Sequence, residues 1–310
     1  MSTPFSPEQI THILIIAIVM VHYIRFLSTP QVAVTSRKSI AISAPLAVTT
    51  DLGDTYLHQD VSLLVRLIDV KAAAVIAEQR VLCKGSSRAL KTSLECNGKY
   101  LGRAVCVHVT TLETQRSIQA REIPQILDVW SHDFTLTDKE RSEPLVVRKV
   151  SPGTGQVLCI WEETGDSIAR HVWDASLGFL IYLQQALEER INPGPKMLKT
   201  LLSRNKRLQI LELGTGCGTV GIAFAQQFNC HVTLTDLDDA MDILETNVKQ
   251  ASPATQTKLT KATLDWGEDV EASLQQSYDI ILLSDCIYNP DSSVALVRTL
   301  LDIATSAPQA

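Results

Sequence analysis

Residues 208–228 constrain the fold of this 310-residue chain more than any other stretch. They read as an apolar strand, "LQILEL" (208–213), then a loop with glycines at 214, 216 and 218, then a helix, "TVGIAFAQQF" (219–228). Glycine adopts positive φ and lets a ligand approach the main chain closely. A strand, a glycine-rich turn and a helix in this order predict a crossover unit of a parallel sheet, with a ligand bound at the turn.

The alternation of strands and helices continues to the end of the chain. Strands are predicted at 231–236, 262–266 and 278–285, and helices at 240–250, near 268–276 and at 292–304. Nearly continuous apolar strands separated by helices indicate a parallel sheet covered on both faces. Right-handed crossovers then give an α/β fold with a doubly wound, mostly parallel, Rossmann-like sheet. Ligands bind at the carboxyl ends of such strands, so the residues directly after each strand are the candidate site.

The part of the chain before this sheet is predicted to form a smaller region. Residues 1–55 give a poorly defined segment with a short apolar run at 13–21, and residues 56–142 give an α+β region. Within it, residues 60–83 predict a helix and residues 103–112 a strand. A β-hairpin around "SPGTG" (143–163) and a helix over 164–187, capped by Asp166 or Ser167, open a third domain that covers 143–310.

The composition of the chain limits the classes of ligand and partner that it is expected to bind. The net charge of −6 and the pI near 5.7 give no global sign of nucleic-acid binding. Seven cysteines without a C-x-x-C pair, and without histidines at zinc-ligand spacing, predict reduced thiols in an intracellular protein and no metal site. The expected location is the cytoplasm, with the nucleus as a second location. The sequence gives no oligomeric state.

The apolar run at 13–21 is too short to span a bilayer, which takes about 20 residues. It also lacks the basic residues that precede the apolar run of a signal peptide. We expect a buried helix or strand here, with a membrane-anchored N-terminus as the alternative.

Two kinds of ligand compete for the glycine loop. Residues 216–221 match G-x-G-x-x-G, and Asp236 follows about 20 residues later, so a dinucleotide is one candidate. Two features argue against its pyrophosphate: Gly214 precedes the fingerprint, and Glu212 puts a negative charge at the strand end. They favour a cationic ligand without phosphate, such as S-adenosylmethionine. A tight turn that binds nothing is the third interpretation.

Polar and aromatic side chains follow the other strands. Asp236 is suited to accept hydrogen bonds from two ribose hydroxyls, or to cap the next helix. Trp266 offers a flat apolar face to an adenine, or packs in the core. Asp285 and Tyr288 follow the fourth strand, where they are suited to hold a substrate ammonium, or to serve as a helix cap and a packed aromatic.

Four segments in order, "LELGTGCGTVGIAFA", "TDLDDAMDILETNV", "LDWG" and "SDCIY", resemble the seven-β-strand methyltransferases of methyltransferase family 16. Upstream, "ARHVWDASLGFLIYL" is also similar, and the resemblance covers about residues 143–300. It implies S-adenosylmethionine as the cofactor and a lysine of a protein substrate as the acceptor. The implied reaction is an in-line methyl transfer from a sulfonium to a neutral amine, for which the protein mainly aligns the reactants.

The resemblance also implies roles for individual residues. Asp285 and Tyr288 match the family's D-x-x-Y element, in which the aspartate would orient the substrate lysine. The residues implied to bind the cofactor are Trp173 at its methionine end, Asp236 at the ribose, Trp266 at the adenine, Ser284 beside the adenine or sulfonium, and Glu212, Gly214, Thr215, Gly216 and Gly218 in the loop.

The chain departs from the family pattern at its C-terminus. Three strands normally follow the D-x-x-Y strand, yet only 22 residues follow Tyr288. The fourth strand would then be a bare apolar edge, so we expect either a truncated domain or coverage of this edge by residues 56–142.

Two other functions stay open: a methyltransferase-like interaction module with impaired catalysis, and a nucleotide-dependent oxidoreductase. Methylation of RNA or of a small molecule is compatible with the same fold. The acidic balance and the D-C-I-Y sequence at 285–288 disfavour nucleic acid.

Overall fold

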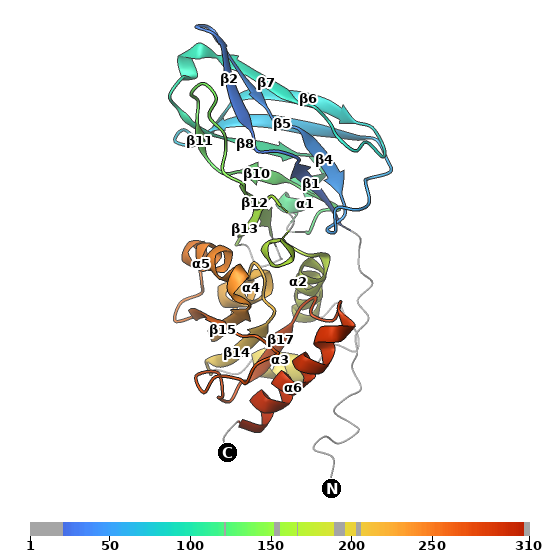
Figure 1. The fold of residues 1–310 in the computed structure, drawn as a ribbon, viewed down its shortest axis with the longest axis vertical. Helices are drawn as coiled ribbons and strands as arrows, with labels where there is room; N and C mark the ends of the chain where they lie inside the picture. Colours follow the sequence, from blue (N-terminus) through green and yellow to red (C-terminus); the bar gives the residue numbers. More distant parts are fainter. Residues whose placement is uncertain are drawn as a thin grey trace.

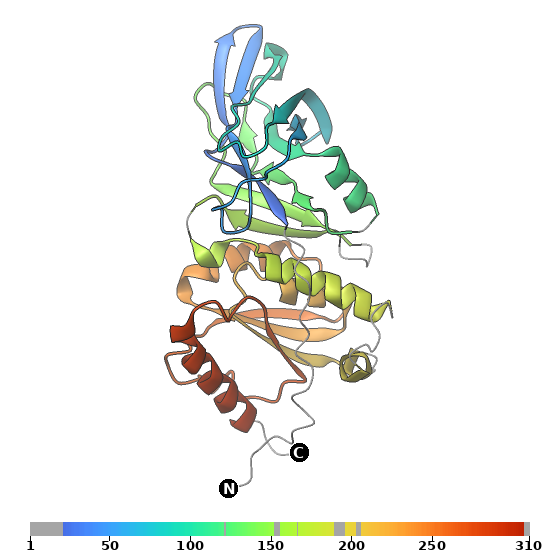
Figure 2. The same ribbon diagram turned by 90° about the vertical axis from the view of Figure 1, so that its right-hand side faces the viewer.

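The computed structural model describes residues 21–120, 122–151, 156–165, 167–188, 196–202 and 206–306. Of the apolar run at 13–21 only Val21 belongs to these residues, so its predicted structure lies outside them. Figures 1 and 2 show two stacked parts, which we call the β-region (residues 22–163) and the parallel-sheet region (residues 168–306). None of the described helices has the length and apolar character needed to cross a membrane.

The β-region consists almost entirely of strands. They are β1 (His22–Phe26), β2 (Gln31–Ser36), β3 (Ser39–Ser43), β4 (Leu46–Thr49), β5 (Val61–Asp69), β6 (Ala74–Cys83), β7 (Ser93–Asn97), β8 (Ala104–Thr110), β9 (Ile126–Leu127), β10 (Val129–Ser131), β11 (Phe134–Thr135), β12 (Leu145–Val150) and β13 (Leu158–Glu163). The large sheet has the order β13-β12-β10-β8-β5-β6, with β11 paired to β8. Two small sheets, β4-β1-β9 and β2-β3-β7, pack with it around a core that includes Ile24, Ile40 and Val107.

Residues 61–83 form a hairpin, so the predicted helix over 60–83 was wrong. β5 and β6 pair antiparallel, from Val61 opposite Cys83 to Asp69 opposite Ala74. β5 lies inside the sheet and is buried on both faces, so its apolar residues run on without the alternation of a half-buried strand. Helix α1 (Leu112–Gln119) is the one α-helix among the described residues of this region, so the predicted α+β class was also wrong.

The strand predicted over 103–112 is confirmed as β8, and the predicted hairpin is confirmed as β12 and β13. The hairpin does not open the parallel-sheet region, however. β12 pairs with β10, so the hairpin ends the large sheet of the β-region. The predicted boundary at residue 55 does not separate two structural units. Strands before it pair with strands after it, β1 with β9 and β3 with β7.

The predicted parallel sheet is present. Its strands are β14 (Leu208–Leu213), β15 (Cys230–Asp236), β16 (Lys258–Thr263) and β17 (Ile280–Leu283), in the order β16-β15-β14-β17, and every pair is parallel. The helical segments are η3 (Ile168–Arg170), α2 (Asp174–Leu187), α3 (Lys196–Leu202), α4 (Thr219–Gln227), η4 (Asp238–Ala240), α5 (Met241–Gln250) and α6 (Pro290–Ser306).

Two of the predicted helices differ from the structure. The helix expected over 164–187 begins only at Asp174, because the backbone is extended at His171 and Trp173. Of its two predicted caps, Asp166 lies outside the described residues, and Ser167 precedes η3 without a side-chain hydrogen bond. Residues 268–276 form turns instead of a helix, although Val270 and Leu274 are buried there.

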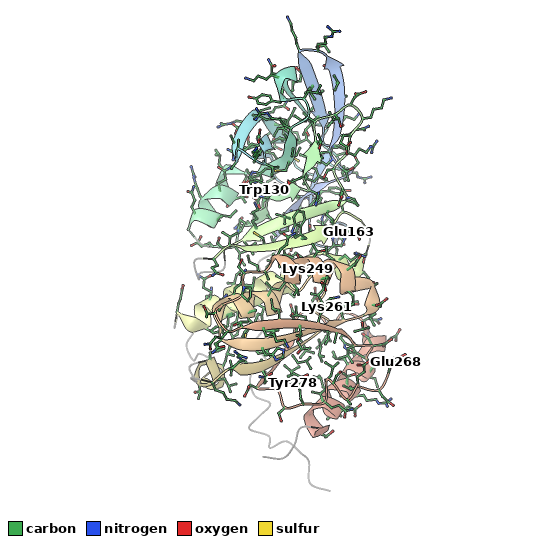
Figure 3. The ribbon with its side chains drawn as sticks, turned by 90° about the vertical axis from the view of Figure 1, so that its left-hand side faces the viewer. Trp130, Glu163, Lys249, Lys261, Glu268 and Tyr278 are labelled. Atoms are coloured by element: carbon green, nitrogen blue, oxygen red, sulfur yellow. The ribbon has the colours of Figure 1, made fainter. Side chains whose placement is uncertain are left out.

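Helices cover both faces of the parallel sheet. α2, α4 and α5 lie between this sheet and the β-region, and α6 lies on the opposite face (Figures 1 and 2). The face of the sheet that carries α2, α4 and α5 shares one hydrophobic core with the hairpin of β12 and β13. This core contains Ile160, Phe224 and Val232. Figure 3 shows Glu163 of β13 and Lys249 of α5 on the two sides of this junction. The hairpin therefore joins the two regions through packing.

β17 is the edge of the parallel sheet in the described part of the chain. It pairs with β14, and no described strand of residues 56–142 lies on its other side, so the predicted coverage by these residues was wrong. Apolar side chains are exposed nearby: Ile287 after the strand, with 81% of its surface accessible, and Val294, Val297 and Leu301 on α6.

Candidate functional site

The order of the strands creates a crevice at the ends of β14 and β17. The connections from these neighbouring strands leave toward opposite faces of the sheet, through α4 and α6. Such a switch point is where doubly wound sheets bind ligands. A cavity of about 780 Å³ opens there, within the range of roughly 300–1,000 Å³ that is usual for small-molecule sites.

Every predicted site residue except Gly218 lines this cavity. The lining ones are Trp173, Glu212, Gly214, Thr215, Gly216, Asp236, Trp266, Ser284, Asp285 and Tyr288. Gly218 instead precedes α4 with a φ of +82°, and a Cβ there would approach Leu244 Cδ1 to 2.8 Å. It therefore shapes the turn behind the cavity.

The first two glycines of the loop bring the main chain close to the cavity. Gly214 and Gly216 have φ values of +62° and +54°, which side chains rarely permit. A Cβ on Gly214 would come within 2.9 Å of Cys286 Sγ and 3.2 Å of Trp266 Cζ2. The indole of Trp266 thus lies directly against the glycine loop.

Glu212 supports the glycine loop through hydrogen bonds. Its Oε2 accepts hydrogen bonds from Thr215 Oγ1 at 2.7 Å and from the Gly221 N–H at 2.9 Å. Burial raises the pKa of Glu212 to about 7, outweighing these two donors, which lower it. In the structure Glu212 therefore supports the glycine loop.

Asp236 also fixes the glycine loop through a hydrogen bond. Its Oδ2 accepts from the Gly216 N–H at 2.6 Å, and its Oδ1 accepts from the Leu237 N–H at 2.8 Å. Burial raises the pKa of this carboxyl. The alternative role of capping α5 is not seen, since the residue before that helix is Ala240. Ribose binding stays a prediction.

Asp285 adopts a strained backbone conformation at the rim of the cavity. Its φ is +60°, a left-handed value that costs an L-residue on the order of 1 kcal/mol and that clusters at functional sites. Partial burial and then the carboxylate of Asp51 raise the pKa of Asp285. It does not cap α6, because Asn289 Oδ1 takes the Asp291 N–H at 3.0 Å. Tyr288 is 65% exposed beside it.

Sequence reasoning missed two cavity residues of the β-region, Asp51 and Leu52. They lie in a turn after β4, and Asp51 Oδ2 accepts from the Asp174 N–H at 3.3 Å. The local signal, "DLGD", indicates only a turn. Nothing in the sequence places that turn beside residues more than a hundred positions later.

Two buried polar atoms in the cavity wall have no hydrogen-bond partner among the described residues. They are Ser284 Oγ and His171 Nδ1. His171 is only 8% exposed, and its Nε2 lies 2.8 Å from Gly165 O, which leaves Nδ1 as an acceptor. Both atoms suit a polar ligand.

The charge of the cavity wall is strongly negative. Its described residues include no lysine or arginine, whereas six carboxylates line it: Asp51, Glu212, Asp236, Asp239, Asp265 and Asp285. These carboxylates would repel a pyrophosphate and attract a cation. The glycine loop, the indole and this charge together suit a cationic ligand that carries a nucleoside.

Comparison with known proteins points to one family. Residues 153–310 match a family model described as lysine methyltransferase. The chain is 30% identical to UPF0665 family protein C23C4.06c of Schizosaccharomyces pombe, over 91% of this chain and 85% of that protein, so the similarity includes the β-region. It is also 30% identical to protein N-lysine methyltransferase METTL21A of Mus musculus, over 51% of this chain and 65% of the relative. It is 32% identical to EEF1A lysine methyltransferase 3 of Xenopus tropicalis, over 43% of this chain and 51% of the relative.

The chain thus spans less than two thirds of the length of these two lysine methyltransferases. Among solved structures, the S-adenosylmethionine-dependent methyltransferase SibL is 18% identical over 41% of this chain and 36% of its own, with a TM-score of 0.28.

Proposed function

This chain belongs to the lysine methyltransferase family, and from this membership we propose that it transfers a methyl group from S-adenosylmethionine to a lysine side chain of a protein. The observation that carries the proposal is the acidic cavity at the switch point, lined by the glycine loop, Trp266 and Asp285. S-adenosylmethionine supplies a methyl group activated by a sulfonium when it is bound.

The residues around the loop would hold the nucleoside end of this cofactor. Asp236 is anchored by Gly216 and lines the cavity, where its carboxylate is suited to accept from ribose hydroxyls. Trp266 offers its face to the adenine next to Gly214, and Ser284 Oγ is a free polar atom beside it. Trp173, whose Nε1 donates to Ile168 O at 2.9 Å, would contact the methionine end.

Asp285 and Tyr288 would orient the acceptor amine. Both lie after β17 and line the cavity, so a lysine that enters from solvent meets them at the rim. Asp285 attracts the ammonium, and the exposed ring of Tyr288 packs on its aliphatic stem. Holding the amine in line with the methyl group supplies most of the rate enhancement expected of such a site.

Calorimetric titration of the full chain with S-adenosylhomocysteine tests the cofactor site. We expect micromolar binding to the wild-type chain and none to Gly216→Arg, since an arginine there would fill the cavity. Gly102→Arg is the matched control: Gly102 also has a positive φ, of +80°, but a Cβ there meets nothing within 4 Å. This variant should bind like the wild type.

Two results would contradict the proposal. A folded chain that binds no S-adenosylhomocysteine would favour an interaction module, to which the exposed apolar residues near β17 would be suited. Binding of NADH alone would favour an oxidoreductase.

A further inference from the structure

We propose that the turn at residues 50–55 of the β-region forms one wall of the entrance for the substrate lysine, and that Asp51 positions the lysine ammonium there together with Asp285. The inference rests on the proposed function and assigns a part of the same reaction to a region outside the parallel sheet. It makes Asp51 a substrate-positioning residue.

The turn contacts the methyltransferase site directly. Asp51 and Leu52 line the same cavity as Trp173, Asp285 and Tyr288. The Asp51 carboxylate accepts from the main-chain N–H of Asp174, the first residue of α2 and the neighbour of Trp173. The turn therefore reaches the end of the cavity at which the methyl group would be transferred.

The turn is held in place from behind. Arg25 Nη2 donates to Asp51 O at 2.6 Å, and Arg25 Nε donates to Thr49 Oγ1 at 3.2 Å. Within the turn, Thr50 Oγ1 donates to Asp54 Oδ1 at 3.0 Å, and the Gly53 N–H donates to Thr50 O at 3.1 Å. Arg25 donates to a carbonyl and a hydroxyl oxygen and not to the Asp51 carboxylate, whose oxygens accept from the N–H groups of Leu52 and Asp174. A carboxylate has about four acceptor positions, so Asp51 can still accept from a cation.

Hydrogen bonds also fix the β-region to the start of α2, and these bonds hold the turn in position beside the site. Tyr23 and Val21 donate to Asp174 at 2.7 and 3.2 Å. Glu162 of β13 accepts from the Val172 N–H at 3.0 Å. These bonds join β1, the residue before it and β13 to Val172 and Asp174, the two neighbours of Trp173.

The charges at the entrance suit an ammonium. Asp51 and Asp285 line the same cavity, and burial followed by the charge of Asp51 raises the pKa of Asp285. None of the described lysines, arginines or histidines forms an ion pair with either one within 4 Å. An arriving ammonium would relieve this repulsion.

Apolar surface beside these charges suits the stem of the same side chain. Leu52 and Tyr288 both line the cavity, and they are 71% and 65% exposed. A long aliphatic chain that ends in a cation buries its methylene groups on such surfaces while its charge meets the carboxylates. Of the common side chains, lysine has this form.

The test uses two probes and the full chain. In both probes, which derive from S-adenosylhomocysteine, a nitrogen replaces the sulfur, and it carries either an aminobutyl or a butyl chain. Calorimetry gives the affinity for each probe, and their ratio measures the preference for the amine. We expect Asp51→Asn to lower this ratio about tenfold, as expected for the loss of one charge-assisted contact, with the butyl affinity unchanged.

Asp54→Asn is the matched control. Asp54 lies in the same turn and loses the same charge, but it is exposed and does not line the cavity. Its ratio should equal that of the wild type. An unchanged ratio in Asp51→Asn, or an equal loss of both affinities, would overturn the role of Asp51 while leaving the cofactor site intact. Failure of both probes to bind the wild-type chain would refute the proposed function and this inference with it.

Discussion

The hydroxyl of Tyr23 donates a hydrogen bond of 2.7 Å to Asp174 Oδ1, across 151 positions of the chain. Tyr23 belongs to β1 and is fully buried, and Asp174 begins α2 beside the candidate site. Burial raises the pKa of Asp174, and the Tyr23 hydroxyl opposes this effect. The bond ties the start of α2 to the β-region, and it stabilises the ionised carboxylate.

Tyr23→Phe should destabilise the protein by about 2 kcal/mol at pH 7, because a hydrogen bond to a buried carboxylate is lost while the ring remains. Urea unfolding measures the change. Tyr278→Phe is the control (Figure 3): the Tyr278 hydroxyl donates to a neutral carbonyl, Leu274 O at 3.1 Å, in a half-buried place. Its cost should stay below about 1 kcal/mol. Equal losses of unfolding free energy in the two variants would show that the hydrogen bond to Asp174 stabilises the protein no more than one to a neutral carbonyl.

The pKa of Glu212 gives stability a pH dependence. Since this pKa is about 7 in the folded chain and ordinarily 4.5, the folded protein holds a proton that the unfolded chain releases between these values. The contribution is full below pH 4.5 and is lost as the pH rises through 7, a change of about 3 kcal/mol.

Glu212→Gln removes this titration, because a glutamine oxygen accepts both hydrogen bonds without a charge. Urea unfolding of both chains from pH 4.5 to 8 should show the wild type losing stability relative to the variant as the pH rises. Parallel curves would mean that the Glu212 carboxyl ionises as easily in the folded chain as in the unfolded one.

Gly221 allows α4 to pack closely on the sheet. A Cβ there would collide with the side chains of Leu234 and Glu212, so Gly221→Ala should cost about 1–3 kcal/mol. Gly178 in α2 provides the contrast, since a Cβ there meets nothing within 4 Å. Gly178→Ala should stabilise the helix by up to about 1 kcal/mol. Thermal unfolding distinguishes the two signs, and a stabilised Gly221→Ala chain would contradict the close packing.

Arg148 and Glu162 form a buried ion pair in the hairpin that joins the two regions. The nitrogen–oxygen distance is 2.7 Å, and the two side chains are only 2% and 1% exposed. Burial alone would raise the pKa of Glu162, but Arg148 and Arg25 outweigh it and hold this pKa below its usual value. Each charge therefore depends on its partner.

Arg148→Met should cost about 3–5 kcal/mol, because it leaves the buried Glu162 carboxylate unpaired. Adding Glu162→Gln removes that charge, so the double variant should be more stable than the sum of the two single costs by at least about 1 kcal/mol. Urea unfolding of the four chains closes the cycle. Strict additivity would mean that the pair contributes no coupling.

The sequence predicted the parallel sheet and most of the site for a physical reason. Each crossover unit is local, so the order of strand, turn and helix indicates its own structure. Carboxyl ends of parallel strands meet at one edge, and this brings Gly214, Asp236, Trp266 and Asp285 to one cavity although they follow four different strands.

The sequence did not predict the class of the β-region or its share in the site. A strand such as β5, buried on both faces, lacks the alternation that distinguishes a strand from a helix. The hairpin at 145–163 pairs with β10 as well as with itself, and only that second pairing decides which region it joins. Local patterns contain no information about such distant partners.

For this protein, therefore, the sequence alone determined the glycine loop, the parallel sheet and the residues at its strand ends, because the pattern of each strand, turn and helix is local in the chain. Only the tertiary structure decided that Asp51 and Leu52 complete the cavity wall. Their place depends on Asp174 and Arg25, which are distant in sequence and meet them through the packing of whole sheets.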